Sequence, residues 1–268
     1  FLFTANPEDY TNRGSIVTPL KDRIGSQILT HYPVDIETAR LITEQEAKLV
    51  ESQKEMVVVP DLARDLLEQI VFEARESDFI DAKSGVSARL SITALENLLS
   101  TAERRALKAG DDKTMVRLSD FVGIIPSITG KVELVYEGEQ EGAAVVAYNL
   151  IGEAVKSLFE EFFPKIEKLK TQDEESPYDD IVSWFFNQKE GFELLDDARE
   201  KEYKNLLDAI SPLDDLLGKH QPNLAKEDSY FVKEFVLWAL VEFKQLSKYR
   251  FTEGTQFKDP YGSFISGI

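Results

Sequence analysis

The stretch Phe3-Thr-Ala-Asn6-Pro7-Glu-Asp-Tyr10 decides how the rest of the sequence is interpreted. The apolar residues before Asn6 are typical of the end of a buried strand, and Pro7 stops it because proline has no amide hydrogen to pair. Proline also disfavours helical backbone in the preceding residue, so we expect Asn6 to stand where the strand leaves its sheet. Ligands of α/β proteins gather at such strand ends. An Asn-Pro-x-Asp stretch is equally a common turn, because asparagine side chains readily turn the backbone.

Two arginines follow in short segments that contain glycine. The first is Arg23 in Thr18-Pro-Leu-Lys-Asp-Arg-Ile-Gly25, and the second is Arg89 in Gly85-Val-Ser-Ala-Arg89-Leu, just before a predicted helix. An arginine at a helix N-terminus faces a partial positive charge, which is unfavourable unless an anion is bound there. The alternative interpretation is that both arginines are surface residues that point into solvent.

Taken in order, these three segments resemble the second half of an AAA+ ATPase module of the magnesium-chelatase I-subunit and MoxR branch. The resemblance spans roughly residues 1–150. It implies that Asn6 is "sensor 1", which orients the attacking water, and that Arg23 is the finger that reaches a neighbouring subunit's ATP. It implies that Arg89 is "sensor 2", which contacts the γ-phosphate in its own subunit.

The same resemblance implies cofactors and partners for the full-length protein. These are ATP and Mg²⁺, bound in a homo-oligomeric ring with six subunits. The family's work is metal insertion into a tetrapyrrole or remodelling of a partner protein with an integrin-like domain, and the sequence leaves both open.

A phosphate-binding loop is missing from the sequence. The nearest candidate, Gly123 to Lys131, has six residues between its glycines where the pattern has four. Val132 replaces the Ser or Thr that would hold Mg²⁺, and Pro126 removes a backbone donor from a loop that has to donate. We therefore expect a C-terminal portion of an ATPase whose phosphate-binding half lies upstream. Alone, this portion is expected to be inactive and to bind no cofactor.

Composition and charge exclude several classes of function. The net charge is −18, and residues 131–268 hold 16 Lys and Arg against 28 Asp and Glu, a net charge of −12. This balance argues against nucleic acid and against anionic membranes as partners. The chain has no cysteine and two histidines, which excludes disulfides and a histidine-rich metal site, and we predict no metal ligands.

Location and the alternative function follow from the same composition. No apolar run approaches the ~20 residues of a membrane helix, and the start does not have the pattern of a signal peptide, so we expect a cytoplasmic protein. The alternative to an ATPase is a non-enzymatic helical module whose acidic surface binds a basic partner protein.

Hydrophobic periodicity predicts a mainly α fold. The resemblance implies that residues 1–34 are a remnant of the AAA+ α/β core and that residues 35–128 are its helical lid, and we expect an acidic helical extension over 129–268. Three predicted helices have local start or stop signals: one begins after a cap at Asp35, one follows Arg89 with a cap at Ser91 or Thr93 and an end at Gly110, and a short one over 119–125 ends at Pro126. Apolar periodicity predicts further helices over 62–75, 142–163, 181–188 and 196–209. The last predicted helix is long and apolar and covers 229–249. The tail over 251–268 is expected to be irregular.

Overall fold

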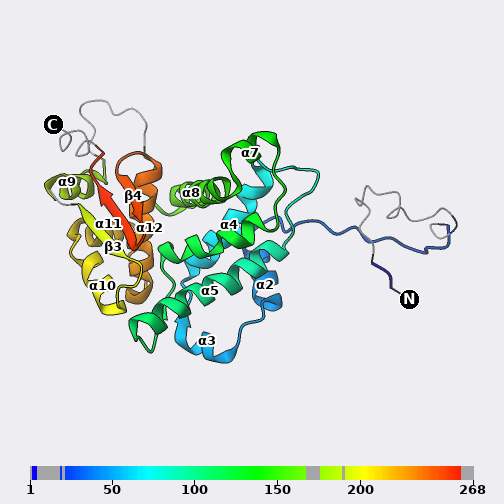
Figure 1. Cartoon of the computed structure of the whole chain (residues 1–268), viewed down its shortest axis with the longest axis horizontal. Helices are drawn as coiled ribbons and strands as arrows, with labels where there is room; N and C mark the ends of the chain where they lie inside the picture. The colour runs from blue at the N-terminus through cyan, green and yellow to red at the C-terminus, as the bar shows by residue number, and fades with distance from the viewer. Residues whose placement is uncertain (1, 5–18, 20–21, 167–175, 189–190, 261–268) are drawn as a thin grey trace. The chain divides into compact units, whose positions relative to one another are not determined.

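The computed structural model describes residues 2–4, 19, 22–166, 176–188 and 191–260, and these residues are mainly α-helical (Figure 1). The chain divides into two units, Phe1–Tyr32 and Pro33–Ile268. In the first unit, residues 22 and 23 form a turn and residues 24–32 have irregular backbone. The expected buried strand is not formed over residues 2–4, where Leu2 and Phe3 are exposed, because no strand among the described residues pairs with it.

The second unit begins with a group of helices joined by short connections. They are α2 (Ile36–Glu46), α3 (Glu51–Met56), α4 (Asp61–Glu76), α5 (Arg89–Ala109), the 3₁₀-helix η1 (Leu118–Ile124), α6 (Ile125–Thr129) and α7 (Tyr136–Glu141). Two short strands, β1 (Val57–Val58) and β2 (Thr114–Met115), pair in parallel beside them. This part of the chain therefore has the helical character that the sequence predicts.

Helix ends in this group follow local signals, with two exceptions. Asp35 caps α2 by accepting a hydrogen bond from the Thr38 amide at 2.7 Å, and Gly110 ends α5 with a left-handed φ of 74°. The predicted cap of α5 is wrong, because the helix starts at Arg89 and Ser91 is buried. The predicted role of Pro126 is also wrong. It lies in the first turn of α6, where a missing amide hydrogen costs nothing.

The described part of the chain from residue 143 onward adds five helices and a three-stranded antiparallel sheet. The helices are α8 (Ala143–Phe162), α9 (Asp179–Asn187), α10 (Glu200–Asp208), α11 (Ser211–His220) and α12 (Lys226–Glu242). The sheet has the order β3-β5-β4, with β3 (Phe192–Leu195), β4 (Ser247–Phe251) and β5 (Gly254–Lys258). The predicted helix to residue 249 is therefore wrong, and so is the irregular backbone predicted for residues 251–258, because residues 247–258 form a hairpin that pairs with β3. Residues 261–268 of the predicted tail lie outside the described residues. None of the helices in the described ranges combines the length and apolar character needed to cross a bilayer.

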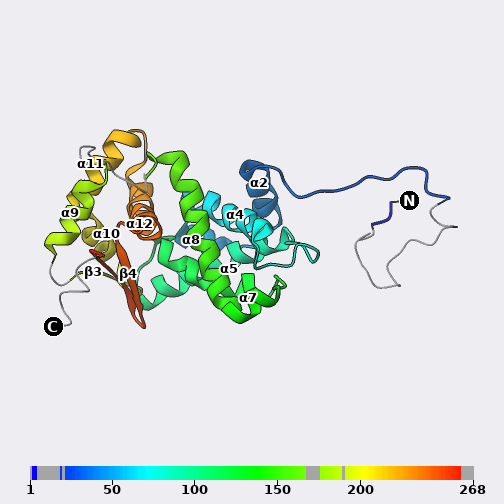
Figure 2. The same cartoon turned by 90° about the horizontal axis from the view of Figure 1, so that it is seen from above.

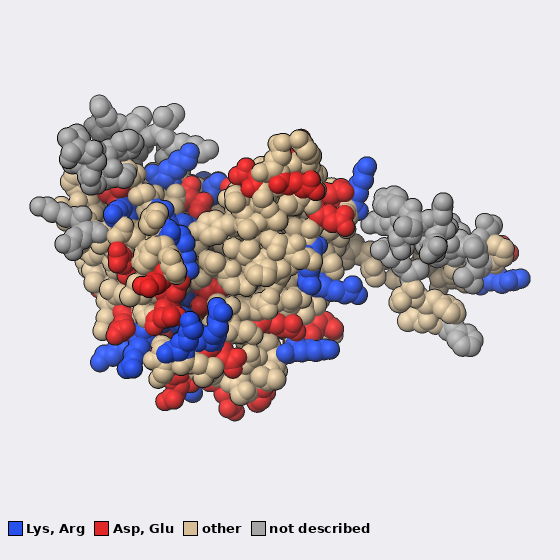
Figure 3. Space-filling model, in the orientation of Figure 1, with Lys and Arg blue, Asp and Glu red and all other residues tan. Residues whose placement is uncertain are grey.

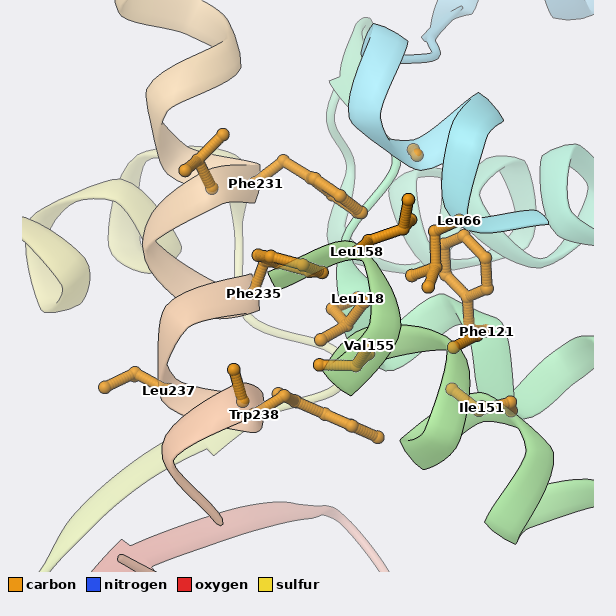
Figure 4. Packing of buried hydrophobic residues seen from close by; sticks show 14 of the residues in the cluster. Leu66, Leu118, Phe121, Ile151, Val155, Leu158, Phe231, Phe235, Leu237 and Trp238 are labelled. Atoms are coloured by element: carbon orange, nitrogen blue, oxygen red, sulfur yellow. The ribbon is translucent and has the colours of Figure 1, made fainter. Parts of the chain in front are cut away.

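Helix α8 lies between α4 and α12 in both views (Figures 1 and 2) and packs against both. Figure 4 shows Phe235 and Trp238 of α12 pointing toward Val155 of α8, whereas Leu237 points to the other side of α12. All residues from 230 to 240 are buried, so α12 is buried on more than one side. One hydrophobic core thus runs from α4 to α12, with no break at residues 128 and 129.

Candidate functional site

The three residues that the family resemblance selects are placed differently. Asn6 lies outside the described residues. Arg23 lies in the turn of the first unit, and Arg89 is the first residue of α5 in the second unit; both side chains are exposed. The two arginines therefore belong to different units of the chain.

The backbone before α5 presents Arg89 to solvent from a fixed position. Gly85 has a left-handed φ of 67°, a conformation that residues with a side chain rarely adopt. Val86 and Leu90, on either side of the arginine, are buried in the hydrophobic core. The Ser87 hydroxyl accepts a hydrogen bond from the Arg89 amide at 3.2 Å. The main chain of Arg89 is therefore held on both sides while its side chain stays outside.

The surroundings of the Arg89 guanidinium favour an anion. The first turn of α5 contains no acidic residue, and the guanidinium forms no ion pair with any residue that the structure describes. A cation beside a helix N-terminus is unfavourable by about 0.3–1 kcal/mol. A phosphate or carboxylate bound there would remove this cost, because arginine binds such groups through parallel hydrogen bonds.

Below Arg89, a buried polar cluster joins three helices. Thr43 of α2, Glu68 of α4 and Ser91 of α5 are each at most 3% exposed. The Thr43 hydroxyl donates to the Ser91 hydroxyl at 2.9 Å, and both hydroxyls partly oppose the effect of burial on the pKa of the Glu68 carboxyl. Burial raises the pKa of Glu68 above its ordinary value of 4.5. The sequence does not reveal that Glu68 and Thr43 are buried, because each falls within an ordinary amphipathic helix.

A second buried cluster lies near the other end of α5. Arg105 donates from Nε to Asp120 Oδ1 at 2.9 Å and from Nη2 to Asp120 Oδ2 at 2.8 Å, and both side chains are almost fully buried. Arg105 therefore differs from Arg104 and Lys108 near the same end of α5, whose side chains are exposed. The signal in the sequence is its position, three residues after the buried Ala102 and seven after Leu98 on the same helix face.

This second cluster continues into η1, α10 and α12. The Arg117 guanidinium lies 4.1 Å from the centre of the Tyr203 ring, and Tyr203 donates to Glu234 at 2.7 Å. Glu234 also accepts from the Leu118 amide at 2.9 Å. Burial raises the pKa of both Tyr203 and Glu234. Because these side chains are enclosed, the cluster holds η1 against α10 and α12 and is not accessible to a substrate.

A surface cleft of about 630 Å³ lies beside the C-terminal end of α5. Its opposite charges pair with one another, as in Lys108–Asp197 at 3.5 Å and Arg250–Asp196 at 2.5 Å. No group of three or more histidine or acidic residues that could hold a metal ion occurs within the described ranges. The chemistry of this cleft therefore points to no particular ligand.

The segment from Gly123 to Lys131 is not a phosphate loop. It forms the end of η1, the whole of α6 and the turn after it. Gly123 packs so closely on α5 that a Cβ atom there would lie 2.2 Å from the Thr101 hydroxyl. Gly123 therefore allows η1 to pack closely on α5, which agrees with rejecting a phosphate loop in this segment from its sequence.

Arg89 has an exposed guanidinium at a helix N-terminus, and its main chain is held in place by its neighbours. A buried polar cluster, in which Thr43 is hydrogen-bonded to Ser91, lies close to it in the chain. These features define the candidate site. Comparisons with models of protein families, with curated proteins and with solved structures find no match to this chain.

Proposed function

We propose that this chain is the C-terminal portion of an AAA+ ATPase of the magnesium-chelatase I-subunit and MoxR branch. One observation carries the proposal: Arg89 begins a long helix of a helical group, with its backbone fixed and its guanidinium unpaired among the described residues. A residue that senses a γ-phosphate needs this combination. The segment Gly85-Val-Ser-Ala-Arg89 also resembles the "sensor 2" segment of that branch.

In this proposal, ATP and Mg²⁺ bind at the junction between subunits of a cytoplasmic, hexameric ring. Asn6 orients the attacking water and Arg89 binds the γ-phosphate within its own subunit. Arg23 reaches the neighbouring subunit's γ-phosphate, where an arginine finger contributes about 10³–10⁵ in rate. A phosphate loop outside this sequence holds the phosphates, so the chain alone is inactive. The energy of hydrolysis drives metal insertion or the remodelling of an integrin-like partner.

The test is ATP turnover by the ATPase that contains this chain together with its phosphate-binding half. We expect Arg23→Ala to lower kcat by about 10³ or more while ATP binding changes little, because a finger acts mainly in the transition state. Arg89→Ala should lower turnover and weaken ATP binding as well. Arg104→Ala is the matched control, because it removes another exposed arginine of α5.

Three outcomes would refute this function. Turnover of Arg23→Ala near the wild-type rate rejects the finger, and turnover and ATP binding of Arg89→Ala that match those of Arg104→Ala reject the sensor. A natural gene that encodes this chain without a phosphate loop rejects the ATPase as a whole.

A non-enzymatic interaction module is the second candidate. The acid excess of residues 131–268 favours it, as do the exposed aromatic side chains of Phe186 and Tyr249. On the face drawn in Figure 3, however, acidic and basic side chains alternate around an uncharged central area. This candidate predicts a basic protein partner whose binding weakens with salt, needs no ATP and survives Arg89→Ala.

A further inference from the structure

A groove of about 520 Å³ is formed where α2 and α8 both pack on α4, which lies between them in both views (Figures 1 and 2). It is lined by residues between 36 and 44 of α2, by residues between 158 and 162 of α8 and by Asp65 of α4. Eight residue steps of a helix measure about 12 Å, so the groove is long enough to hold two turns of a partner helix.

The apolar residues of the groove form a floor and an exposed edge. Leu158 of α8 is buried, and Ile36 and Phe162 are half-buried against the hydrophobic core. Leu41 of α2 is 62% exposed, so most of its side chain faces water. A partner that covers these side chains gains free energy, because apolar surface is removed from water.

Acidic side chains dominate the charge of the groove. Four acidic residues and one basic residue line it, namely Glu37, Glu44, Asp65 and Glu161 against Arg40. Arg40 is already paired with two aspartates of α4 at 2.8 Å each, and Glu44 pairs with Arg64 at 2.5 Å. Glu37 and Glu161 are exposed, and neither forms an ion pair with any residue that the structure describes. These two carboxylates are therefore available to the cations of a partner.

The apolar and acidic features together select one class of partner. Charge complementarity favours a cationic ligand and disfavours nucleic acid and anionic membranes. Over the described ranges of the chain, no group of three or more histidine or acidic residues could hold a metal ion. A cationic amphipathic helix fits both features, because such a helix lays its apolar face into a hydrophobic groove and keeps its charges at the edges.

We propose that this groove binds a basic amphipathic helix of a partner protein. Its apolar residues cover Leu41 and Phe162, and its lysines or arginines pair with Glu37 and Glu161. The proposal is compatible with either candidate function, because it assigns no role to Arg23 or Arg89.

The experiment uses this chain and two synthetic peptides of about 14 residues, made of leucine and lysine. In the first peptide the leucines recur at i, i+3, i+4 and i+7, so that they form one face of a helix. The second has the same composition with its leucines spread around the helix. Fluorescence anisotropy measures the affinity of each labelled peptide at low and at physiological salt, and nitrogen-15 NMR shifts of the chain locate the first peptide. We expect the first peptide to bind more tightly, to weaken with salt, and to shift resonances of residues 36–44 and 158–162.

Two variants test the acidic and the apolar features separately. Glu37→Gln combined with Glu161→Gln should weaken binding of the first peptide roughly 2- to 30-fold, the factor that two exposed ion pairs are worth. Leu41→Ser should weaken it roughly 10-fold, because an apolar contact is lost. All three side chains are exposed, so we expect these variants to fold like the wild type.

Each variant has a matched control elsewhere in the chain. Glu137→Gln combined with Glu141→Gln removes the same charge from exposed positions near the two ends of α7. Leu107→Ser changes a leucine of α5 that is 66% exposed, close to the value for Leu41. Both controls should bind the first peptide like the wild type.

Several results would overturn the proposal. These are equal affinities of the two peptides, shift changes confined to other surfaces, and groove variants that bind as tightly as their controls. Self-association of the chain that Leu41→Ser abolishes would also overturn it, because a second copy of the chain would then occupy the groove. Sedimentation of the wild type and of Leu41→Ser, without peptide, decides this last point.

Discussion

Replacing Asp120 by alanine should lower the free energy of unfolding by about 3–5 kcal/mol, because the buried guanidinium of Arg105 loses the carboxylate that it pairs with. The carboxylate accepts two hydrogen bonds from Arg105 and one from the Arg117 amide. After the substitution, Arg105 keeps the Thr114 hydroxyl and the Met115 carbonyl as acceptors, with the Glu200 carboxylate 4.0 Å away. These remaining contacts place our expectation at the lower end of that range, about 3 kcal/mol.

The assay is urea denaturation, with Asp197→Ala as the matched control. Asp197 pairs with Lys108 of the same helix at 3.5 Å, and both of these side chains are mostly exposed. Exposed pairs contribute about 0–1 kcal/mol, so the control should unfold almost like the wild type. Equal losses in the two variants would refute the reasoning. A second check is the double variant Arg105→Met with Asp120→Leu, which should recover much of the loss, because apolar residues of similar volume replace buried ion pairs at little cost.

Three further predictions concern single side chains, each measured as unfolding free energy in urea. Gly123→Ala should destabilise by about 1–3 kcal/mol, because its Cβ would lie 2.2 Å from Thr101 Oγ1; no loss would contradict this packing. Gly218→Ala should stabilise by about 0.4–1 kcal/mol, because the site in α11 is open and alanine restricts the unfolded chain; a loss would contradict it. Burial lowers the pKa of Lys248 to about 8 from 10.5, so the folded state releases this proton first, and stability should rise from pH 8 toward 10.5. Lys248→Met should lack that rise, and the same slope in both proteins would refute it.

Local sequence signals located most of the long helices. The cap at Asp35 and the left-handed Gly110 each act within one helical turn, so their effect can be read from neighbouring residues. The end of α12 has no such signal. The apolar run continues to Phe243, and the helix stops where Lys244 adopts a φ of 61°, a conformation usually left to glycine. Pattern alone therefore extends this helix too far.

The C-terminal sheet could not be predicted from local pattern, because its pairing is nonlocal. Phe192 of β3 lies opposite Phe257 of β5, and neither strand is longer than five residues. Gly254 allows the close approach of β3, since a Cβ there would lie 2.5 Å from the Leu194 carbonyl oxygen. From the sequence alone, a glycine at position 254 was compatible with the irregular tail that we expected there.

The candidate site was predictable at its surface and not beneath it. Arg89 stands in a segment whose residue types indicate an exposed cation at a helix start, and the structure places it there. Its supports come from elsewhere in the chain: Ser91 meets Thr43 across 48 positions. Asp120 and Arg105 likewise find each other through tertiary packing. Charged residues in amphipathic helices are ordinarily exposed, and only three-dimensional contacts reveal the exceptions.

The place of α8 between α4 and α12 has a consequence for biosynthesis. On the ribosome, α8 is complete long before α12, whose Phe235 ring packs 6.1 Å from that of Phe159. Until α12 emerges from the ribosome, the apolar side of α8 that α12 covers in the folded protein is exposed to water. Exposed apolar surface of this kind makes a nascent chain prone to aggregate. Newly made molecules should accordingly depend on chaperones until α12 docks, and a stop codon ahead of Lys226 should yield an aggregating product rather than a smaller stable protein.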